Sequence, residues 1–222
     1  MSAHTIILIL LSLFELGLMG YVLVAYQRTP SIYALAGLLF GFGAMSFLVG
    51  LIPIVESESL RLFLGRAGFY SGAITFASLI VLAAYYPLPS VLPKSSLKLV
   101  VLLPLLFFLP FIFLYDGFLR KVEIFQGSAQ AITGSGFWAL TVFSAGALLF
   151  SLALMFKKKR FVSGQQRRQV GYFISLMLCT GVIGLITDFV LPHAGIRVNS
   201  SLGLEGGGVV ALFIASIVLR KV

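Results

Sequence analysis

Seven runs of about 20 predominantly apolar residues follow one another along this chain, and each is long enough to cross a bilayer as a helix. A helix rising 1.5 Å per residue spans the roughly 30 Å hydrocarbon core in that length. We therefore predict an all-α integral membrane protein, a seven-transmembrane helix bundle that forms one domain over residues 1–222. The expected spans are about 5–26, 32–54, 65–86, 97–115, 136–156, 170–191 and 201–219.

The composition excludes an ordinary soluble domain. The chain is 59% hydrophobic and only 10% charged, whereas about a quarter of the residues in a soluble domain are charged. The net charge of +9 would suit nucleic acid in a soluble protein, but in a membrane protein an excess of Lys and Arg marks cytoplasmic loops. We expect the lipid bilayer as a partner and no nucleic acid.

The distribution of the cations predicts the orientation. Eleven of the 16 Lys and Arg residues fall on one side of the expected bundle and five on the other, and six of the eleven lie in the loop 157–168. By the positive-inside rule the N-terminus is outside and the C-terminus is cytoplasmic. The longest outer loop, 116–136, is half apolar. It is expected to form a short amphipathic helix at the interface or to cover the outer mouth of the bundle.

Three acids inside apolar runs are the main candidates for a functional site, because an ionisable group in a membrane span is costly. Asp188, near the end of the sixth span, and Glu205, near the start of the seventh, are expected at similar depth on the outer side, with Arg66 and Arg197 as possible counter-charges. Glu15 is expected about 15 Å deep, near the midplane. The alternative is purely structural: an ion pair that fixes helix register, or for Glu15 a protonated acid bonded to a carbonyl or hydroxyl.

Small residues and prolines indicate how the helices pack. Gly37 and Gly41 form a GxxxG pattern, which predicts close helix contact. Pro104 and Pro110 are expected to kink the fourth span. The run of glycines at 206–208 either permits very close backbone approach or makes the outer half of the last helix easy to deform.

Nothing in the sequence favours catalysis, a metal site or a cofactor. The only histidines, His4 and His193, lie in outer polar segments, so no HExxH motif or nucleophile-base pair can be assembled. Cys179 has no partner for a disulfide. The last span has no lysine that could form a Schiff base with retinal. We expect no catalytic residue in this chain.

Several local patterns together resemble the seven-helix N-terminal sensory region of bacterial histidine kinases. The matching pieces, which cover most of the chain, are LFLGRAGFYSG, AAYYP, QRRQVGYF, DFVLPHAGI, LGL and the cationic end IVLRKV. The resemblance implies a bacterial inner membrane, a possible homodimer, and a last helix that runs into a cytoplasmic transmitter. Its recurrent positions are Arg66, Tyr70, Tyr86, Gln169, Pro192 and Gly195. In this family proline often follows the LG of the last span, where this chain has LGLEGGG.

These observations lead to one functional prediction and two alternatives. We expect a membrane sensory module that binds a small or lipophilic signal from the outer side and passes a shift of the last two spans to a cytoplasmic partner or domain outside this chain. The binding or polar-cluster candidates are Asp188, Glu205, Arg66, Arg197, Tyr70 and Glu15. The alternatives are a small transporter or proton-linked permease that uses Glu15 with Asp188, and an assembly subunit whose Gly37–Gly41 face binds another membrane protein.

Overall fold

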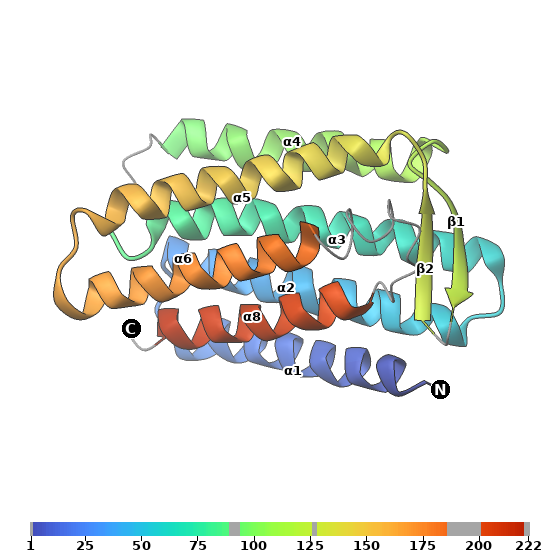
Figure 1. Cartoon of the computed structure of the whole chain (residues 1–222), viewed down its shortest axis with the longest axis horizontal. Helices are drawn as coiled ribbons and strands as arrows, with labels where there is room; N and C mark the ends of the chain where they lie inside the picture. Colours follow the sequence, from blue (N-terminus) through green and yellow to red (C-terminus); the bar gives the residue numbers. More distant parts are fainter. Residues whose placement is uncertain (1, 89–93, 126–127, 186–200, 220–222) are drawn as a thin grey trace.

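The computed structural model describes residues 2–88, 94–125, 128–185 and 201–219, and these form a bundle of long helices with one β-hairpin (Figure 1). The helices in this part of the chain are α1 (Ala3–Ala25), α2 (Pro30–Leu51), α3 (Glu58–Tyr85), α4 (Lys94–Leu114), α5 (Phe137–Lys159), α6 (Gly164–Leu185) and α8 (Ser201–Leu219). A short 3-10 helix, η1 (Ile52–Ile54), follows α2. Each of the seven predicted spans therefore contains a helix.

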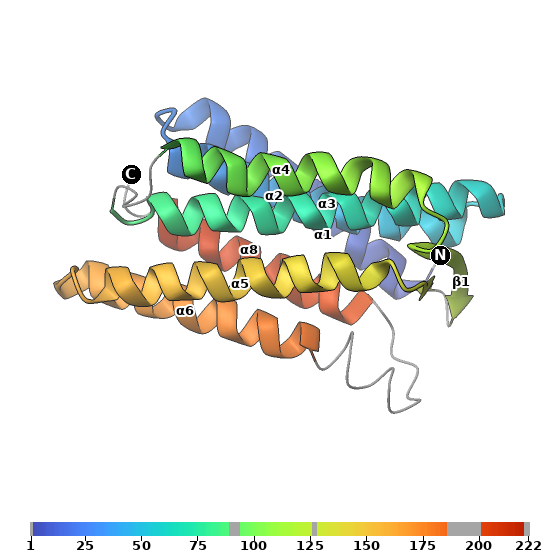
Figure 2. The same ribbon diagram turned by 90° about the horizontal axis from the view of Figure 1, so that it is seen from above.

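Five of the helical segments are long and apolar enough to cross a membrane, which indicates a multi-pass membrane protein. They are Ala3–Ala25, Pro30–Ile54, Glu58–Tyr85, Leu97–Leu114 and Phe137–Lys159. The described part of α8 contributes a shorter apolar stretch, Gly206–Leu219. Both views place the hairpin at one end of the bundle and the end of α8 at the other (Figures 1 and 2). We name these the hairpin end and the C-terminal end.

Hydroxyl side chains fix where the first three helices begin. Ser2, Thr29 and Ser57 each accept a hydrogen bond from the backbone N–H three residues later. Such an N-cap satisfies one of the free N–H groups in the first turn of a helix. Since Ser57 caps α3, this helix starts at Glu58 and not at the predicted residue 65. Its first two turns are polar helix beyond the apolar run.

The GxxxG pattern of α2 packs against α3 inside the chain. A Cβ atom added at Gly37 would lie 2.5 Å from the Ser78 hydroxyl oxygen, and one at Gly41 would lie 2.9 Å from both the Ser71 carbonyl oxygen and the Thr75 backbone nitrogen. Only glycine allows the two backbones to approach this closely. Because α3 already covers this face, the alternative in which the Gly37–Gly41 face binds another membrane protein is wrong.

The outer loop forms a β-hairpin, so the predictions of an all-α fold and of an amphipathic helix in this loop are wrong. Strand β1 (Leu119–Phe125) pairs antiparallel with β2 (Ser128–Thr133). The chain alternates apolar and polar residues here, which suits a strand with one buried face. Leu119 and Val122 are buried against α3 at Gly65, where an added Cβ would lie within 3.0 Å of both side chains.

Two hydrophobic clusters hold the helices together. One lies at the hairpin end and includes Phe108 and Phe118, which are nearly inaccessible to solvent. The other extends to the C-terminal end and joins α2, α3, α5, α6 and α8. Buried aromatic side chains contribute most to such cores, because each removes a large apolar area from its surroundings. The hairpin is thus packed into the bundle and is not a loose loop.

Substituting Gly41 tests the α2–α3 contact. We expect Gly41→Ala to lower the free energy of unfolding by about 1–3 kcal/mol, because the added methyl group meets backbone atoms that cannot move aside. Gly20→Ala is the matched control, since an added Cβ at Gly20 meets nothing within 4 Å. The measurement is chemical unfolding in detergent micelles. Equal stability of the two variants would show that α2 and α3 are not this close.

Candidate functional site

Glu15 is the most unusual polar residue in the described structure. It lies in the middle of α1 with 0% of its surface exposed, and neither carboxyl oxygen has a hydrogen-bond partner among the described residues. A buried polar group normally has a partner, because leaving one without costs about 1–3 kcal/mol. The alternative in which Glu15 bonds to a carbonyl or a neighbouring hydroxyl is therefore wrong for the described part of the chain.

Glycines of two other helices make the space in which Glu15 lies. A Cβ added at Gly43 of α2 would come within 3.3 Å of the Glu15 Cβ, and one at Gly208 of α8 would lie 2.9 Å from its Oε1. A Cβ at Gly207 would lie 2.6 Å from the Phe42 ring. The glycines of α8 thus permit close approach, which was one of their two predicted roles. We call this meeting of α1, α2 and α8 the Glu15 contact.

The surroundings of Glu15 offer small hydroxyls and no cation. Ser12 lies one turn earlier on α1 and donates to the Ile9 carbonyl oxygen at 2.7 Å. Ser46, three residues after Gly43 on α2, is fully buried and also has no partner among the described residues. Helix α2 contains no charged residue. An ionised carboxylate is very costly in such a place, so the packing accommodates the neutral acid.

A second polar cluster joins three helices at the C-terminal end. Tyr86 follows α3 directly and is 3% exposed. Its hydroxyl donates to the Gln169 side-chain oxygen and to the Ile217 carbonyl oxygen, both at 3.4 Å. Its ring stacks on Phe173 with 6.0 Å between the centroids. Tyr86 therefore links the end of α3 to the start of α6 and to the last turn of α8, and we call this the Tyr86 junction.

Lys158 holds the end of α3 beside this junction. Only 4% of the residue is exposed. Its ammonium group donates to the carbonyl oxygen of Ala84, to that of Tyr86 at 3.1 Å and to that of Leu88 at 2.9 Å. The last carbonyls of a helix have no partner within the helix, so a cation placed there satisfies them and interacts favourably with the helix dipole.

The sequence analysis missed Lys158 because it lies in a run of cations that was assigned as a whole to a cytoplasmic loop. A signal was present in the spacing. Ser151, Met155 and Lys158 are separated by four and then three residues, which places them on one face of α5. All three are buried in the structure. Of the three consecutive lysines, only the middle one continues the inward face.

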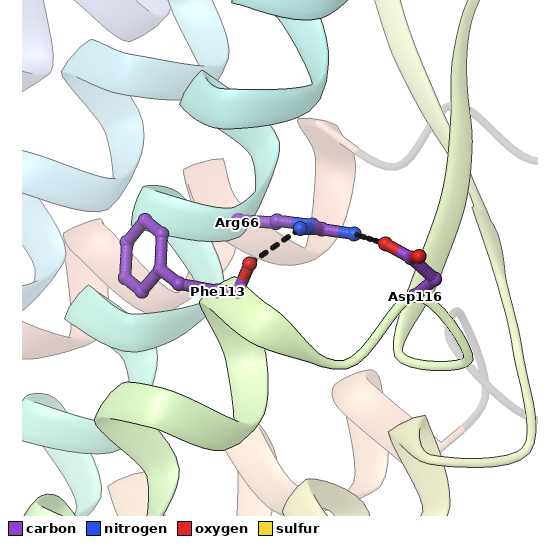
Figure 3. Close-up of polar contacts among 3 residues, drawn as sticks. All are labelled: Arg66, Phe113 and Asp116. Carbon is purple, nitrogen blue, oxygen red and sulfur yellow. Dashed lines mark hydrogen bonds and ion pairs between the residues drawn. The ribbon is translucent and has the colours of Figure 1, made fainter.

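Arg66 is bound to the end of α4 at the hairpin end (Figure 3). Its Nη1 donates to the Phe113 carbonyl oxygen at 2.6 Å, and its Nη2 pairs with Asp116 at 3.2 Å. The Arg66 side chain is 11% exposed, whereas that of Asp116 is fully exposed, so the carbonyl bond is the more sheltered of the two. The ring of Tyr70 packs edge-on against Phe113 with 6.3 Å between the centroids. Arg66 and Tyr70 therefore position α4 on α3.

The predicted outer pair is only partly covered by the structure. Asp188 and Arg197, together with Pro192 and Gly195, lie outside the described residues. Glu205 lies in the first turns of α8, three residues before Gly208, and therefore on the helix face that meets Glu15. The proposed pairing of Asp188 with Glu205 stays a prediction. Within the described ranges, no group of three or more His, Cys, Asp or Glu side chains is placed to bind a metal ion.

Comparison with known proteins adds no family assignment. A scan against protein-family models and a search of curated proteins found no match to this chain.

The missing partner of Glu15 makes a stability prediction. We expect Glu15→Leu to raise the free energy of unfolding by about 1–3 kcal/mol, because it removes a buried polar group that forms no hydrogen bond. Glu15→Gln is the control: it keeps the shape and remains polar, so it should give no comparable gain. Chemical unfolding in micelles measures both. A loss of stability in Glu15→Leu would mean that the carboxyl group has a stabilising partner.

The three bonds of Lys158 make a second prediction. We expect Lys158→Met to cost about 1–3 kcal/mol, because it leaves buried carbonyl oxygens at the end of α3 without a donor. Lys157→Met is the matched control, since Lys157 is the exposed neighbour of Lys158. The measurement is the thermal midpoint of each variant in micelles. The same midpoint for both variants would show that Lys158 does not hold α3.

Proposed function

We propose that this chain is a seven-span sensory module of a bacterial inner membrane, in which α8 carries a conformational change to a cytoplasmic partner. The observation that carries the proposal is the attachment of α8 at two polar points. Its glycine-rich half meets Glu15 in the middle of the bundle, and its last turn meets the Tyr86 junction. A movement at the first point is thereby felt at the second.

The Glu15 contact suits a helix with two positions. In the described packing the carboxyl group forms no hydrogen bond, and this disfavours the packed position by part of the cost of burying a polar group. A small displacement of α8 that lets Glu15 reach a donor or water recovers that cost but loses apolar contact. Opposing terms of similar size give two states that a ligand can shift. Glycines at 206–208 leave no side chains to obstruct the displacement.

The Tyr86 junction suits an output. Ile217 lies two residues before the end of α8, so its bond to Tyr86 reports the position of the helix just before the chain leaves the bundle. The loop 157–168, with six cations, lies between α5 and α6 at this same end, which supports a cytoplasmic location by the positive-inside rule. An N-terminus outside and a signalling partner or fused transmitter inside follow from this orientation, as does a possible homodimer from the family resemblance.

A proton-linked permease is the second candidate, and Glu15 is the observation that favours it. A carboxyl group near mid-span without a partner is a common feature of proton relays. Proton flux into proteoliposomes distinguishes the two functions, because a sensory module moves no substrate. The partner in the permease hypothesis, Asp188, lies outside the described residues.

Two glycine substitutions on α8 test the coupling. We expect Gly208→Ala to change the distance between spin labels on the native Cys179 of α6 and on Ser216→Cys of α8, because the added methyl group displaces α8 from Glu15. Gly206→Ala is the matched control, since its Cβ would only reach 4.0 Å from Ile183. Electron paramagnetic resonance in nanodiscs gives the two distance distributions.

The comparison of the two variants decides the outcome. A shift with Gly208→Ala and none with Gly206→Ala supports transmission along α8. Identical distributions for both variants and the parent would show that α8 does not carry a displacement from the Glu15 contact to the C-terminal end. The proposed sensory mechanism would then be wrong.

A further inference from the structure

An apolar groove of about 600 Å³ runs between α4 and α5 on the surface of α3. Both helices pack on α3, and Ile80 of α3 lines the groove between them. The volume lies in the range of about 300–1,000 Å³ that is typical of sites for small molecules. All of the lining side chains are apolar, and none is charged. The groove therefore favours a neutral, lipophilic occupant.

The groove has a closed side and an open side. The rings of Phe108 and Phe143 meet across α4 and α5 with 5.2 Å between their centroids, and Phe143 is one of the lining residues. On the opposite side Leu103 and Val142 are 61% and 68% exposed. Because these helices are candidate membrane spans, the open side faces the hydrocarbon. A ligand would enter from the bilayer and not from water.

One polar atom is available in this apolar wall. Pro104 lies inside α4 and lines the groove. Proline has no N–H group, so the carbonyl oxygen of Val100, one turn earlier, receives no hydrogen bond from position 104. In a helix that carbonyl points toward residue 104 and thus toward the groove. Pro104 is ten residues from the start of α4 at Lys94, or roughly 15 Å along the helix. Water is scarce at such a depth, and the carbonyl favours a ligand that donates one hydrogen bond.

We propose that this groove is a binding site for a lipophilic alcohol, a molecule with a long hydrocarbon or isoprenoid chain and one hydroxyl group. The chain lies between α4 and α5, and the hydroxyl donates to the Val100 carbonyl oxygen. An acyl chain of an ordinary phospholipid fills the same volume but has no donor to offer. The discriminating feature is therefore the single hydroxyl group.

This inference rests on the proposed sensory function only in supplying a ligand class for it. Binding at the groove is measured directly, without reference to α8 or to any signalling output. A failure of α8 coupling leaves the groove proposal standing, and a failure of binding at the groove leaves the coupling standing. The two proposals also concern different helices, since the groove involves α3, α4 and α5.

The test is photo-crosslinking of the full chain in nanodiscs with a diazirine-tagged fatty alcohol. We expect crosslinks to map to α4 and α5. Unlabelled dodecanol should compete at roughly 3- to 10-fold lower concentration than its methyl ether, which is the effect of one hydrogen bond. Equal competition by the alcohol and the ether would overturn the assignment of the hydroxyl to the Val100 carbonyl oxygen.

Two variants locate the site. An added Cβ at Gly146 meets nothing within 4 Å, and Gly146 lines the groove, so Gly146→Phe should fill it and abolish the crosslinks. Gly20→Phe is the matched control, because Gly20 has the same free space on α1. Pro104→Ala restores an N–H to Val100 and should abolish the preference for alcohol over ether. Crosslinks that persist in Gly146→Phe would show partitioning into lipid without a site.

Discussion

Close approach of helix backbones is the constraint on which the rest of this structure depends. Helices in a bilayer gain little from the hydrophobic effect between them, so they associate through tight packing where small residues remove the obstacle of a side chain. Here Gly37 and Gly41 bring α2 onto α3, and Gly43 and Gly208 bring α2 and α8 onto α1. Helix α2 is the common member of these contacts. The burial of Glu15 is a direct result, because no space remains for water around its carboxyl group.

The two polar clusters on α8 differ in what they contribute. The Tyr86 junction and Lys158 satisfy groups that would otherwise be unpaired at helix ends, so they stabilise the C-terminal end of the bundle. The Glu15 contact does the opposite, since it buries polar oxygens without partners. Stability alone does not account for a buried acid of this kind, and such groups concentrate at functional sites. A helix fixed at one end and strained in its middle is suited to movement.

How much of this was predictable varies with the kind of feature. The seven helices were predictable because apolar runs of membrane length have few other ways to satisfy their backbone groups. The hairpin was not predicted, since its strands are short and their stability depends on packing against Gly65 of α3. Glu15 was identified as costly from its depth alone. Its lack of a partner was not foreseen, because that depends on which faces of α2 and α8 meet it.

The sequence by itself determined the class of protein, the number and order of the helices and the residues that are costly in a membrane. These follow from local composition and length, which act through the same solvent whatever the fold. Only the tertiary structure decided that Arg66 binds the end of α4, that one of three consecutive lysines holds α3, and that α4 and α5 leave a groove. Such features depend on distances between residues far apart in the chain. Those distances are set when all the helices pack together.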